Sequence, residues 1–204
     1  MSDGGAMRAA FLDRDGVINV DHGYVHRPED FTFIDGVFEG CRHLQSLGYA
    51  LIVITNQSGI ARGMFSEADF RALTDWMTAR FAEEGVVLTA VYFCPHHPDY
   101  PDYPGYPGYS DKEQSKGPAP YRHDCDCRKP APGMLLQAIR EYGIDPARSL
   151  MLGDKGADMQ AATAAGVGRR ILVRSGQAFT AQDAAQADEV WDSLHDALSH
   201  VTAG

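Results

Sequence analysis

Short apolar runs alternate along the chain with segments in which apolar residues recur every three or four positions. The short runs are residues 9–12, 50–55, 91–94, 150–153 and 171–173, and each is bounded by polar, glycine or proline positions. Runs of this length and composition are typical of buried β-strands. The pattern therefore predicts five strands, with helical segments between them.

Three of the intervening segments have the spacing and the end signals of helices. Residues 37–48 carry apolar side chains at helical spacing and end at a glycine, a common helix terminator. Ser66 and Asp69 resemble a capping box, and the apolar stripe that follows them consists of Phe70, Leu73, Met77 and Phe81. A third stripe lies within residues 134–142.

Strands that alternate with helices pair in parallel through right-handed crossovers. We therefore expect an α/β fold, a doubly wound Rossmann-like parallel sheet with helices on both faces. The chain has 204 residues, which suits one domain with a full core. We expect a single domain over residues 1–204, with residues 1–8 as a flexible tail.

Two predicted loops, residues 14–35 and 95–131, are longer than their connections need. The second loop contains tyrosine at every third position within residues 100–109, interleaved with proline and glycine. That composition favours an extended, polyproline-like path and cannot pack a core of its own. We interpret residues 100–110 as a surface insertion.

Composition and charge exclude several classes of partner. The hydrophobic fraction of 44% and the charged fraction of 23% are those of an ordinary globular protein. The formal net charge is -10 and there is no basic run, so we expect no nucleic-acid partner. The longest apolar run, residues 49–54, is too short to cross a bilayer. We expect a cytoplasmic protein that does not bind membranes.

Two acids mark the end of the first predicted strand. Asp13 and Asp15 lie two residues apart, so alternation along a strand would turn both carboxylates to the same side, and Gly16 allows a tight bend beneath a ligand. One carboxylate could attack phosphorus while the other transfers protons. Alone, such a pair is more often two solvated surface acids, so the interpretation depends on the other strand ends.

The other strand ends supply groups that bind phosphate and a hard metal ion. The candidates after the second strand are Thr55, Asn56, Gln57 and Ser58, which offer hydroxyl and backbone N–H donors. Arg128 and Lys129 provide fixed positive charge. Asp154 and Asp158 follow the fourth strand with the oxygen ligands that Mg²⁺ prefers. Together these motifs favour a magnesium-dependent phosphatase.

A second constellation is rich in cysteine. Cys94, His96, Cys125 and Cys127 supply three thiolates and one imidazole, a complete tetrahedral set for a structural Zn²⁺ that would tether the long loop. A disulfide or free thiols are the alternatives, and a reducing compartment disfavours a disulfide. Either His97 or His123 could replace His96. Cys41 lies on an apolar helical stripe and is expected to be a core residue.

The order of these motifs resembles the haloacid dehalogenase-like phosphatases between residues 11 and 173. A closer likeness, to the bacterial D-glycero-D-manno-heptose 1,7-bisphosphate phosphatases, rests on six segments. They are Phe-Leu-Asp-Arg-Asp-Gly-Val-Ile-Asn (11–19), Val-Asp-His-Gly-Tyr-Val-His (20–26), Thr-Asn-Gln-Ser-Gly-Ile-Ala-Arg-Gly (55–63), Cys-Pro-His-His-Pro (94–98), Cys-Asp-Cys-Arg-Lys-Pro (125–130) and Gly-Asp-Lys through Asp-Met-Gln-Ala-Ala (153–162). The Tyr/Pro-rich insertion is longer than that family leads us to expect.

The resemblance implies roles for the matching residues. Asp13 would be the nucleophile and Asp15 the general acid, then base. The Asp13 carboxylate, the Asp15 backbone carbonyl and Asp154 would hold Mg²⁺. Thr55, Asn56 and Lys129 would bind the transferring phosphoryl group. The sugar or its second phosphate would contact Asp21, His22, Gly23, Tyr24, Arg128 and Lys155.

The implied activity is removal of the C7 phosphate from a heptose bisphosphate, in the synthesis of nucleotide-activated heptose for lipopolysaccharide core. We expect a monomer without a separate cap domain. Histidinol-phosphate phosphatase, or another small phosphomonoester hydrolase, is the alternative enzyme. A receiver domain also phosphorylates an Asp at a strand end, but such domains lack the second acid that Asp15 provides.

Overall fold

A six-stranded parallel sheet forms the centre of the computed structural model, which describes residues 6–98 and 118–203. The strands lie in the order β3-β2-β1-β4-β5-β6. Their bounds are β1 Arg8–Leu12, β2 Tyr49–Asn56, β3 Leu88–Cys94, β4 Leu150–Gly153, β5 Arg169–Val173 and β6 Glu189–Trp191. This order confirms the doubly wound α/β fold expected from the sequence.

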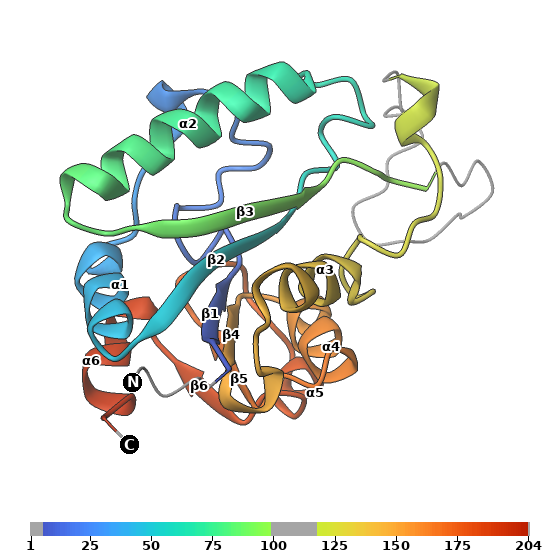
Figure 1. Ribbon diagram of the computed structural model, residues 1–204. Helices are drawn as coiled ribbons and strands as arrows, with labels where there is room; N and C mark the ends of the chain where they lie inside the picture. Colours follow the sequence, from blue (N-terminus) through green and yellow to red (C-terminus); the bar gives the residue numbers. More distant parts are fainter. Residues whose placement is uncertain (1–5, 99–117, 204) are drawn as a thin grey trace.

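Helices cover both faces of the sheet, as Figure 1 shows for α1 and α6 on one side and α3 and α4 on the other. The α-helices are α1 Val37–Ser46, α2 Glu67–Glu83, α3 Gly133–Tyr142, α4 Gly156–Ala164, α5 Ala181–Ala184 and α6 Ala197–His200. The described residues also form the 3-10 turns η1 Pro28–Asp30, before α1, and η2 Ala119–Tyr121, η3 Pro146–Arg148 and η4 Leu194–Asp196.

Alternation along β1 divides the core in two. Ala10 and Leu12 pack into a cluster with side chains of α1, α2 and α6, whereas Ala9 and Phe11 pack into a cluster with side chains of α3 and α4. All four are fully buried. A strand buried on both faces reads as a continuous apolar run, which is why the sequence pattern located β1.

The predicted helix ends agree with the structure. Ser66 Oγ accepts a hydrogen bond from the Asp69 N–H, and the Asp69 carboxylate accepts one from the Ser66 N–H, so α2 begins with the expected capping box. Beyond α1, Gly48 has a φ of 84°, a left-handed conformation that suits glycine.

The N-terminal and C-terminal regions differ from the expectation in detail. Met7 pairs with Ile144 and Arg8 already belongs to β1, although we assigned both to a tail. Strand β6 was not predicted, because it has three residues and its pattern is too short to recognise. The Tyr/Pro-rich stretch 100–110 lies outside the described residues. Across residues 6–98 and 118–203, no helix has the length and apolar character needed to span a membrane.

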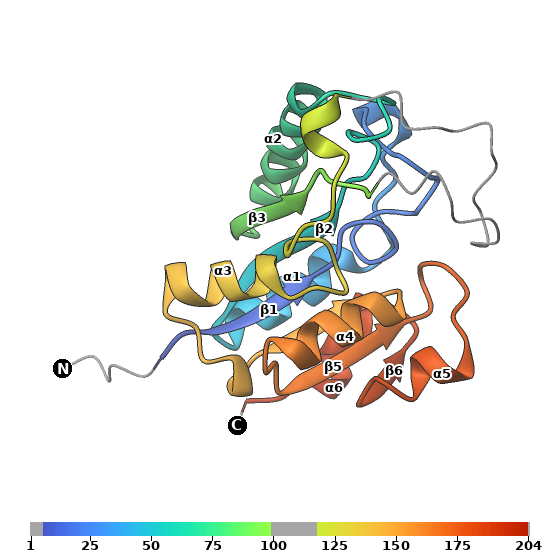
Figure 2. The same cartoon turned by 90° about the vertical axis from the view of Figure 1, so that its right-hand side faces the viewer.

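The loops that follow the strands gather at one end of the sheet. In Figure 2 the blue loop after β1 and the orange loop after β5 lie at the end opposite the N-terminus. The strand order reverses between β1 and β4, which pair side by side. Ligands of doubly wound folds bind at such a switch point, so the carboxyl ends of β1 and β4 are where a site is expected.

The C-terminal turn η4 packs so closely on α1 that Gly40 has no room for a side chain. A Cβ added to Gly40 would lie 2.4 Å from the carbonyl oxygen of Leu194. We therefore expect Gly40→Ala to lower the free energy of unfolding by about 1–3 kcal/mol through overpacking. Denaturant unfolding measures it. Glu39→Ala, on the exposed side of the same helix, should change stability little; equal stability of the two variants would contradict this packing.

Candidate active site

The site begins where β1 and β4 end next to each other. The Asp13 N–H donates to the carbonyl oxygen of Leu152 at 2.9 Å, which extends the β1–β4 pairing by one residue. Asp154 follows β4 directly, so its carboxylate and that of Asp13 emerge from neighbouring strands at the same edge. The side chains of Asp13 and Asp154 are both buried.

A buried lysine lies between two of the carboxylates. Lys129 Nζ is 2.9 Å from Asp13 Oδ1 and 2.6 Å from Asp158 Oδ1, and it donates to the Ile54 carbonyl oxygen at 2.8 Å. Burial acts to lower the pKa of Lys129, but the carboxylates of Asp13 and Asp158 outweigh it and raise that pKa. Its ammonium therefore stays charged, with each of its three protons directed at an oxygen.

Asp13 keeps its place through the same contacts. Burial raises the pKa of Asp13, while the charge of Lys129 opposes that rise. The Arg14 N–H also donates to Asp13 Oδ1 at 2.7 Å. Both donors contact Oδ1 and neither uses the lone pairs of Oδ2, so this arrangement suits a nucleophile.

Asp154 has the features of a metal ligand. Its Oδ2 accepts from the Gln177 N–H at 3.0 Å, whereas its Oδ1 is buried without a hydrogen-bond partner. Burial, followed by the charge of Asp13, raises the pKa of Asp154 to about 7. Oxygen atoms of Asp13, Asp154 and Asp158 lie within 4.8 Å of one another. A hard divalent cation fits this crowded, negative set of oxygen ligands.

Two glycines allow the backbone to approach Asp154. A Cβ at Gly16 would lie 2.5 Å from Asp154 Oδ2, and one at Gly176 would lie 2.3 Å from it. Gly16 has a φ of 88°, which itself favours glycine. The loops after β1 and β5 are joined here by Ser175 Oγ, which donates to the Gly16 carbonyl oxygen at 2.8 Å. The floor of the site is thus built from three strand ends.

The carboxylate of Asp15 is surrounded by hydrogen-bond donors. Arg14 Nη2 lies 2.7 Å from Oδ1 and 2.9 Å from Oδ2. Asn19 Nδ2 donates to Oδ1 at 3.0 Å and Gln57 Nε2 donates to Oδ2 at 3.1 Å. Arg14 is itself buried and donates to the Val25 carbonyl oxygen at 2.8 Å. Asp15 is therefore fixed within the protein beside Asp13.

The side-chain amides of Asn56 and Gln57, at the end of β2, form hydrogen bonds with other residues of the site. Asn56 Nδ2 donates to the Lys129 carbonyl oxygen, and the Lys129 N–H donates to Asn56 Oδ1, both at 3.0 Å. This reciprocal pair holds the Lys129 backbone against the end of β2. Gln57 Nε2 also donates to Thr55 Oγ1 at 2.8 Å. The side chains of Asn56 and Gln57, predicted as phosphate contacts, thus have partners in the protein.

The segment Asp21–Tyr24 forms a turn beside the carboxylates. Asp21 Oδ1 accepts from the Gly23 N–H at 3.0 Å, and its Oδ2 lies 2.7 Å from Gln177 Nε2 and 3.5 Å from Lys155 Nζ. Burial acts to raise the pKa of Asp21. The charge of Lys155 and these hydrogen bonds lower it by more, so the net shift of the pKa is downward. Lys155 also lies 3.6 Å from Asp154 Oδ2. The turn is therefore tied to the carboxylate cluster.

A cavity of about 680 Å³ opens next to this turn. Its lining includes His22, Gly23 and Tyr24, with Glu29 and Met64 among the other residues. In the described part of the chain, no hydrogen bond joins the side chains of His22, Tyr24 or Ser58 to the carboxylate cluster. The structure therefore brings Asp13, Asp15, Asp21, Thr55, Lys129, Asp154 and Lys155 together. It leaves His22 and Tyr24 as lining residues of the cavity, and Ser58 belongs to neither set.

The sequence did not predict two of the contacts at this site, those of Asp158 with Lys129 and of Gln177 with Asp154. Asp158 was seen as one of two acids after β4, but its contact with Lys129 depends on the packing of α4 against the β3–α3 connection. Gln177 lies in the loop after β5, where no motif marks it. A signal existed only for Asp158, in its spacing of four residues from Asp154.

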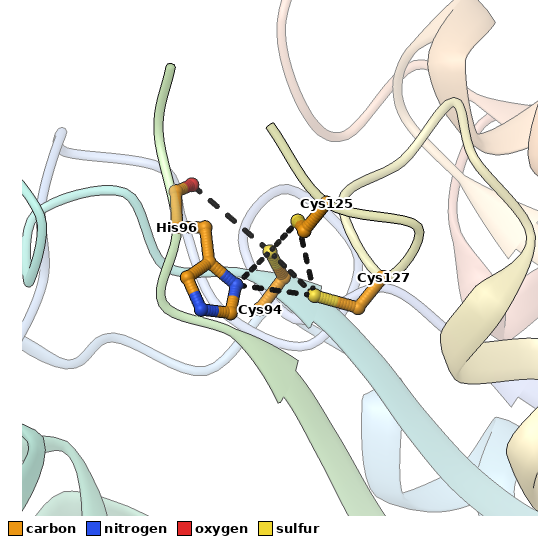
Figure 3. Close-up of side chains that lie close together, drawn as sticks. All are labelled: Cys94, His96, Cys125 and Cys127. Carbon is orange, nitrogen blue, oxygen red and sulfur yellow. Dashed lines mark hydrogen bonds between the residues drawn. The ribbon is translucent and has the colours of Figure 1, made fainter. Parts of the chain in front are cut away.

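The four zinc candidates converge at the end of β3. Figure 3 shows Cys94, His96, Cys125 and Cys127 pointing toward one another. The Cys127 sulfur lies 3.1 Å from that of Cys94 and 3.2 Å from that of Cys125, and His96 Nδ1 lies 3.3 Å from the Cys127 sulfur. None of the cysteines forms a disulfide.

The crowded thiols shift one another's pKa values in opposite directions: the contact with Cys127, followed by burial, raises the pKa of Cys94, and burial raises that of Cys125. The contact with Cys94 is the largest of the effects that lower the pKa of Cys127, which falls to about 5. Deprotonated sulfur is the form that binds zinc. His97 is directed elsewhere, with Nε2 3.0 Å from Arg62 Nη2 and Nδ1 2.8 Å from the Pro98 carbonyl oxygen. Arg128 Nη1 donates to the His96 carbonyl oxygen at 3.3 Å, which links the cluster to the segment that carries Lys129.

Known proteins are similar to this chain in sequence and fold. The HAD-hydrolase-like family matches residues 126–197. A D-glycero-β-D-manno-heptose-1,7-bisphosphate 7-phosphatase of Yersinia pestis is 53% identical over 92% of both chains, and the one of Escherichia coli K12 is 51% identical over 92% of this chain and 90% of its own.

A solved structure is also similar along nearly the whole chain. The D,D-heptose 1,7-bisphosphate phosphatase of B. bronchiseptica, complexed with magnesium and phosphate, superposes with a TM-score of 0.75 at 31% identity and covers 96% of this chain and 98% of its own. With half of its residues identical to the curated relatives over more than nine-tenths of its length, this chain belongs to the D,D-heptose 1,7-bisphosphate phosphatase family of HAD-like hydrolases.

Proposed function

We propose that this chain hydrolyses the C7 phosphate of D-glycero-β-D-manno-heptose 1,7-bisphosphate through a phosphorylated Asp13. The observation that carries the proposal is the buried contact of Asp13 with Lys129 at the end of β1, beside Asp154. Relatives about half identical to this chain are named for that activity. The product would serve the synthesis of nucleotide-activated heptose for lipopolysaccharide.

Each half of the reaction uses the two acids of the first strand end. In the first half, an Asp13 oxygen forms a bond to phosphorus as the bond between phosphorus and the C7 oxygen breaks, and Asp15 donates a proton to that oxygen. In the second half, Asp15 accepts a proton from water as the water oxygen attacks phosphorus, which frees Asp13. Both acids are regenerated, and inorganic phosphate leaves.

The transferring phosphoryl group needs positive charge around its oxygens. We assign this to Lys129, together with the Thr55 hydroxyl and the donors of Ser58. Asn56 supports Lys129 through their two reciprocal hydrogen bonds. The side chain of Asp158 keeps the ammonium charged and in place.

Magnesium fits the carboxylate cluster. The residues that would hold it are the Asp13 carboxylate, the Asp15 backbone carbonyl and Asp154, whose buried Oδ1 has no other partner. The bound ion would supply positive charge that offsets the charge of the phosphoryl oxygens. The four-residue sulfur and imidazole cluster would hold a structural zinc, because all of its ligand positions are filled by the protein.

The sugar would lie outside the carboxylate cluster, along the cavity beside Asp21–Tyr24. A phosphate on the primary C7 carbon extends from the ring and can reach Asp13, while the ring and its anomeric phosphate stay in the cavity. We assign contacts with that remote part to Asp21, His22, Gly23, Tyr24, Arg128 and Lys155. Binding energy from there would position the reacting end.

Replacement of the nucleophile gives the first prediction of this proposal. Asp13→Asn should lower kcat by at least about a thousandfold, because an amide cannot form the covalent intermediate. Steady-state phosphate release measures it, and thermal unfolding should show an intact fold. Asp35→Asn, at an exposed position of the same loop, should keep the wild-type rate. Retention of a tenth of the rate in Asp13→Asn would refute its role.

Metal content tests the cysteine cluster. Purified protein should contain about one zinc per chain, and Cys125→Ser should lose it together with several degrees of thermal stability. Cys41→Ala is the matched control, since burial raises the pKa of Cys41 to about 12 and keeps its thiol away from metal chemistry. Elemental analysis and thermal unfolding give both readouts. Full zinc content in Cys125→Ser would exclude this site.

The position of cleavage can be read from the product. Phosphorus NMR after complete turnover of the heptose bisphosphate should show free phosphate and a surviving anomeric phosphate. A surviving C7 phosphate would mean that the ring end, not the primary carbon, reaches Asp13, and the proposed orientation of the sugar would then be wrong.

A further inference from the structure

Gln57 was expected to bind phosphate, but its side chain is buried and bonded to other protein atoms. It directly follows β2, and only 3% of it is exposed. Its backbone N–H donates to the Cys94 carbonyl oxygen at 2.8 Å. Its side-chain nitrogen lies 3.1 Å from Asp15 Oδ2 and 2.8 Å from Thr55 Oγ1. Both of its N–H-bearing groups are therefore directed at protein atoms.

The hydrogen-bond donors around Asp15 come from two different parts of the chain. Arg14 and Asn19 belong to the same loop as Asp15 and lie within four residues of it. Contacts within one loop set the shape of that loop but not its distance from a neighbouring strand. Among the described residues, Gln57 is the donor to Asp15 that comes from the end of β2.

The second contact of Gln57 makes this distance matter. Thr55 is the hydroxyl that the proposed function assigns to the phosphoryl group, and one amide nitrogen bonds both Thr55 and Asp15. A single rigid amide thus sets where the Asp15 carboxylate lies relative to the bound phosphorus. A general acid must be within hydrogen-bond reach of the leaving oxygen, so a small displacement is costly.

We propose that Gln57 is a positioning residue that holds the general acid Asp15 in register with the phosphoryl group, rather than a ligand of that group. The proposal rests on the proposed function, because it requires Asp15 to protonate the leaving oxygen. Gln57 acts through Asp15 and Thr55 and touches neither the sugar nor the phosphate.

This role makes a prediction about leaving groups. A sugar alkoxide needs a proton as it leaves, whereas p-nitrophenolate leaves as a stable anion and needs none. Loss of a correctly placed general acid therefore slows the formation of phosphorylated Asp13 from the sugar phosphate much more than from p-nitrophenyl phosphate. Loss of a phosphate ligand, or a general loosening of the fold, slows both.

The experiment compares wild type with Gln57→Leu, which removes both side-chain hydrogen bonds and keeps an apolar body of similar size. The measured quantity is kcat/KM, which reports steps up to phosphorylation of Asp13, for the heptose bisphosphate and for p-nitrophenyl phosphate. The inhibition constant of inorganic phosphate reports the phosphate site separately. Gln137→Leu, on the exposed face of α3, is the matched control.

In Gln57→Leu, kcat/KM for the sugar phosphate should fall by about 10–100-fold, because a displaced general acid loses part of its usual contribution to the rate. For p-nitrophenyl phosphate, kcat/KM should fall by less than about threefold. The inhibition constant of inorganic phosphate should stay within about twofold. Gln137→Leu should match wild type throughout. Equal losses on both substrates, no loss on either, or much weaker inhibition by phosphate would each overturn the proposal.

Two further controls keep the test decisive. If Gln57→Leu does not fold, Gln57→Met, which keeps the unbranched shape and adds no charge near the phosphate, should give the same difference between substrates; equal losses would again overturn the proposal. If wild type does not cleave the heptose bisphosphate, the proposed substrate is wrong. The comparison is then made with a primary-alcohol phosphate that wild type does cleave, so the two failures are told apart.

Discussion

The contact of one buried ammonium with two carboxylates is the interaction on which the site depends. Asp13, Asp154 and Asp158 bring three acids within 4.8 Å of one another in a buried region, where like charges repel strongly. Lys129 compensates two of them directly. Removing one partner from such a buried set leaves an uncompensated charge, which typically costs about 3–5 kcal/mol. The remaining negative charge is centred on Asp154, and it suits the divalent cation that the family uses.

The order of the strands in the sheet, rather than proximity in the sequence, brings the carboxylates and Lys129 together. Asp13 and Asp154 follow neighbouring strands at the point where the strand order reverses, although they are 141 residues apart in the chain. Lys129 reaches them from the segment between β3 and α3, and Asn56 fixes its backbone at the end of β2. The cysteine cluster closes the base of that segment. The cysteine cluster and the hydrogen bonds of Asn56 thus hold the loop that carries Lys129.

The sequence predicted what local patterns determine. Continuous apolar runs located five of the six strands, and glycines and a capping box located helix ends, because these features act over a few residues. The acids were found because they stand just after strands, and Lys129 because it stands in the long connection that follows the third strand. Strand β6 was missed because three residues carry no readable period. The partners of Gln57, Asp158 and Gln177 were not predictable from local sequence, since each contact joins loops whose approach depends on the packing of separate elements.

In the proposed reaction, Lys129 and the ends of β1 and β4 place Asp13 as the nucleophile that attacks phosphorus. Rapid acid quenching of a single turnover, followed by proteolysis and mass spectrometry, tests it most directly. The account predicts a transient phosphate on the peptide that contains Asp13, localised to that residue and absent once turnover is complete. A phosphate on another residue, or the absence of any phosphorylated peptide while product forms, would contradict it.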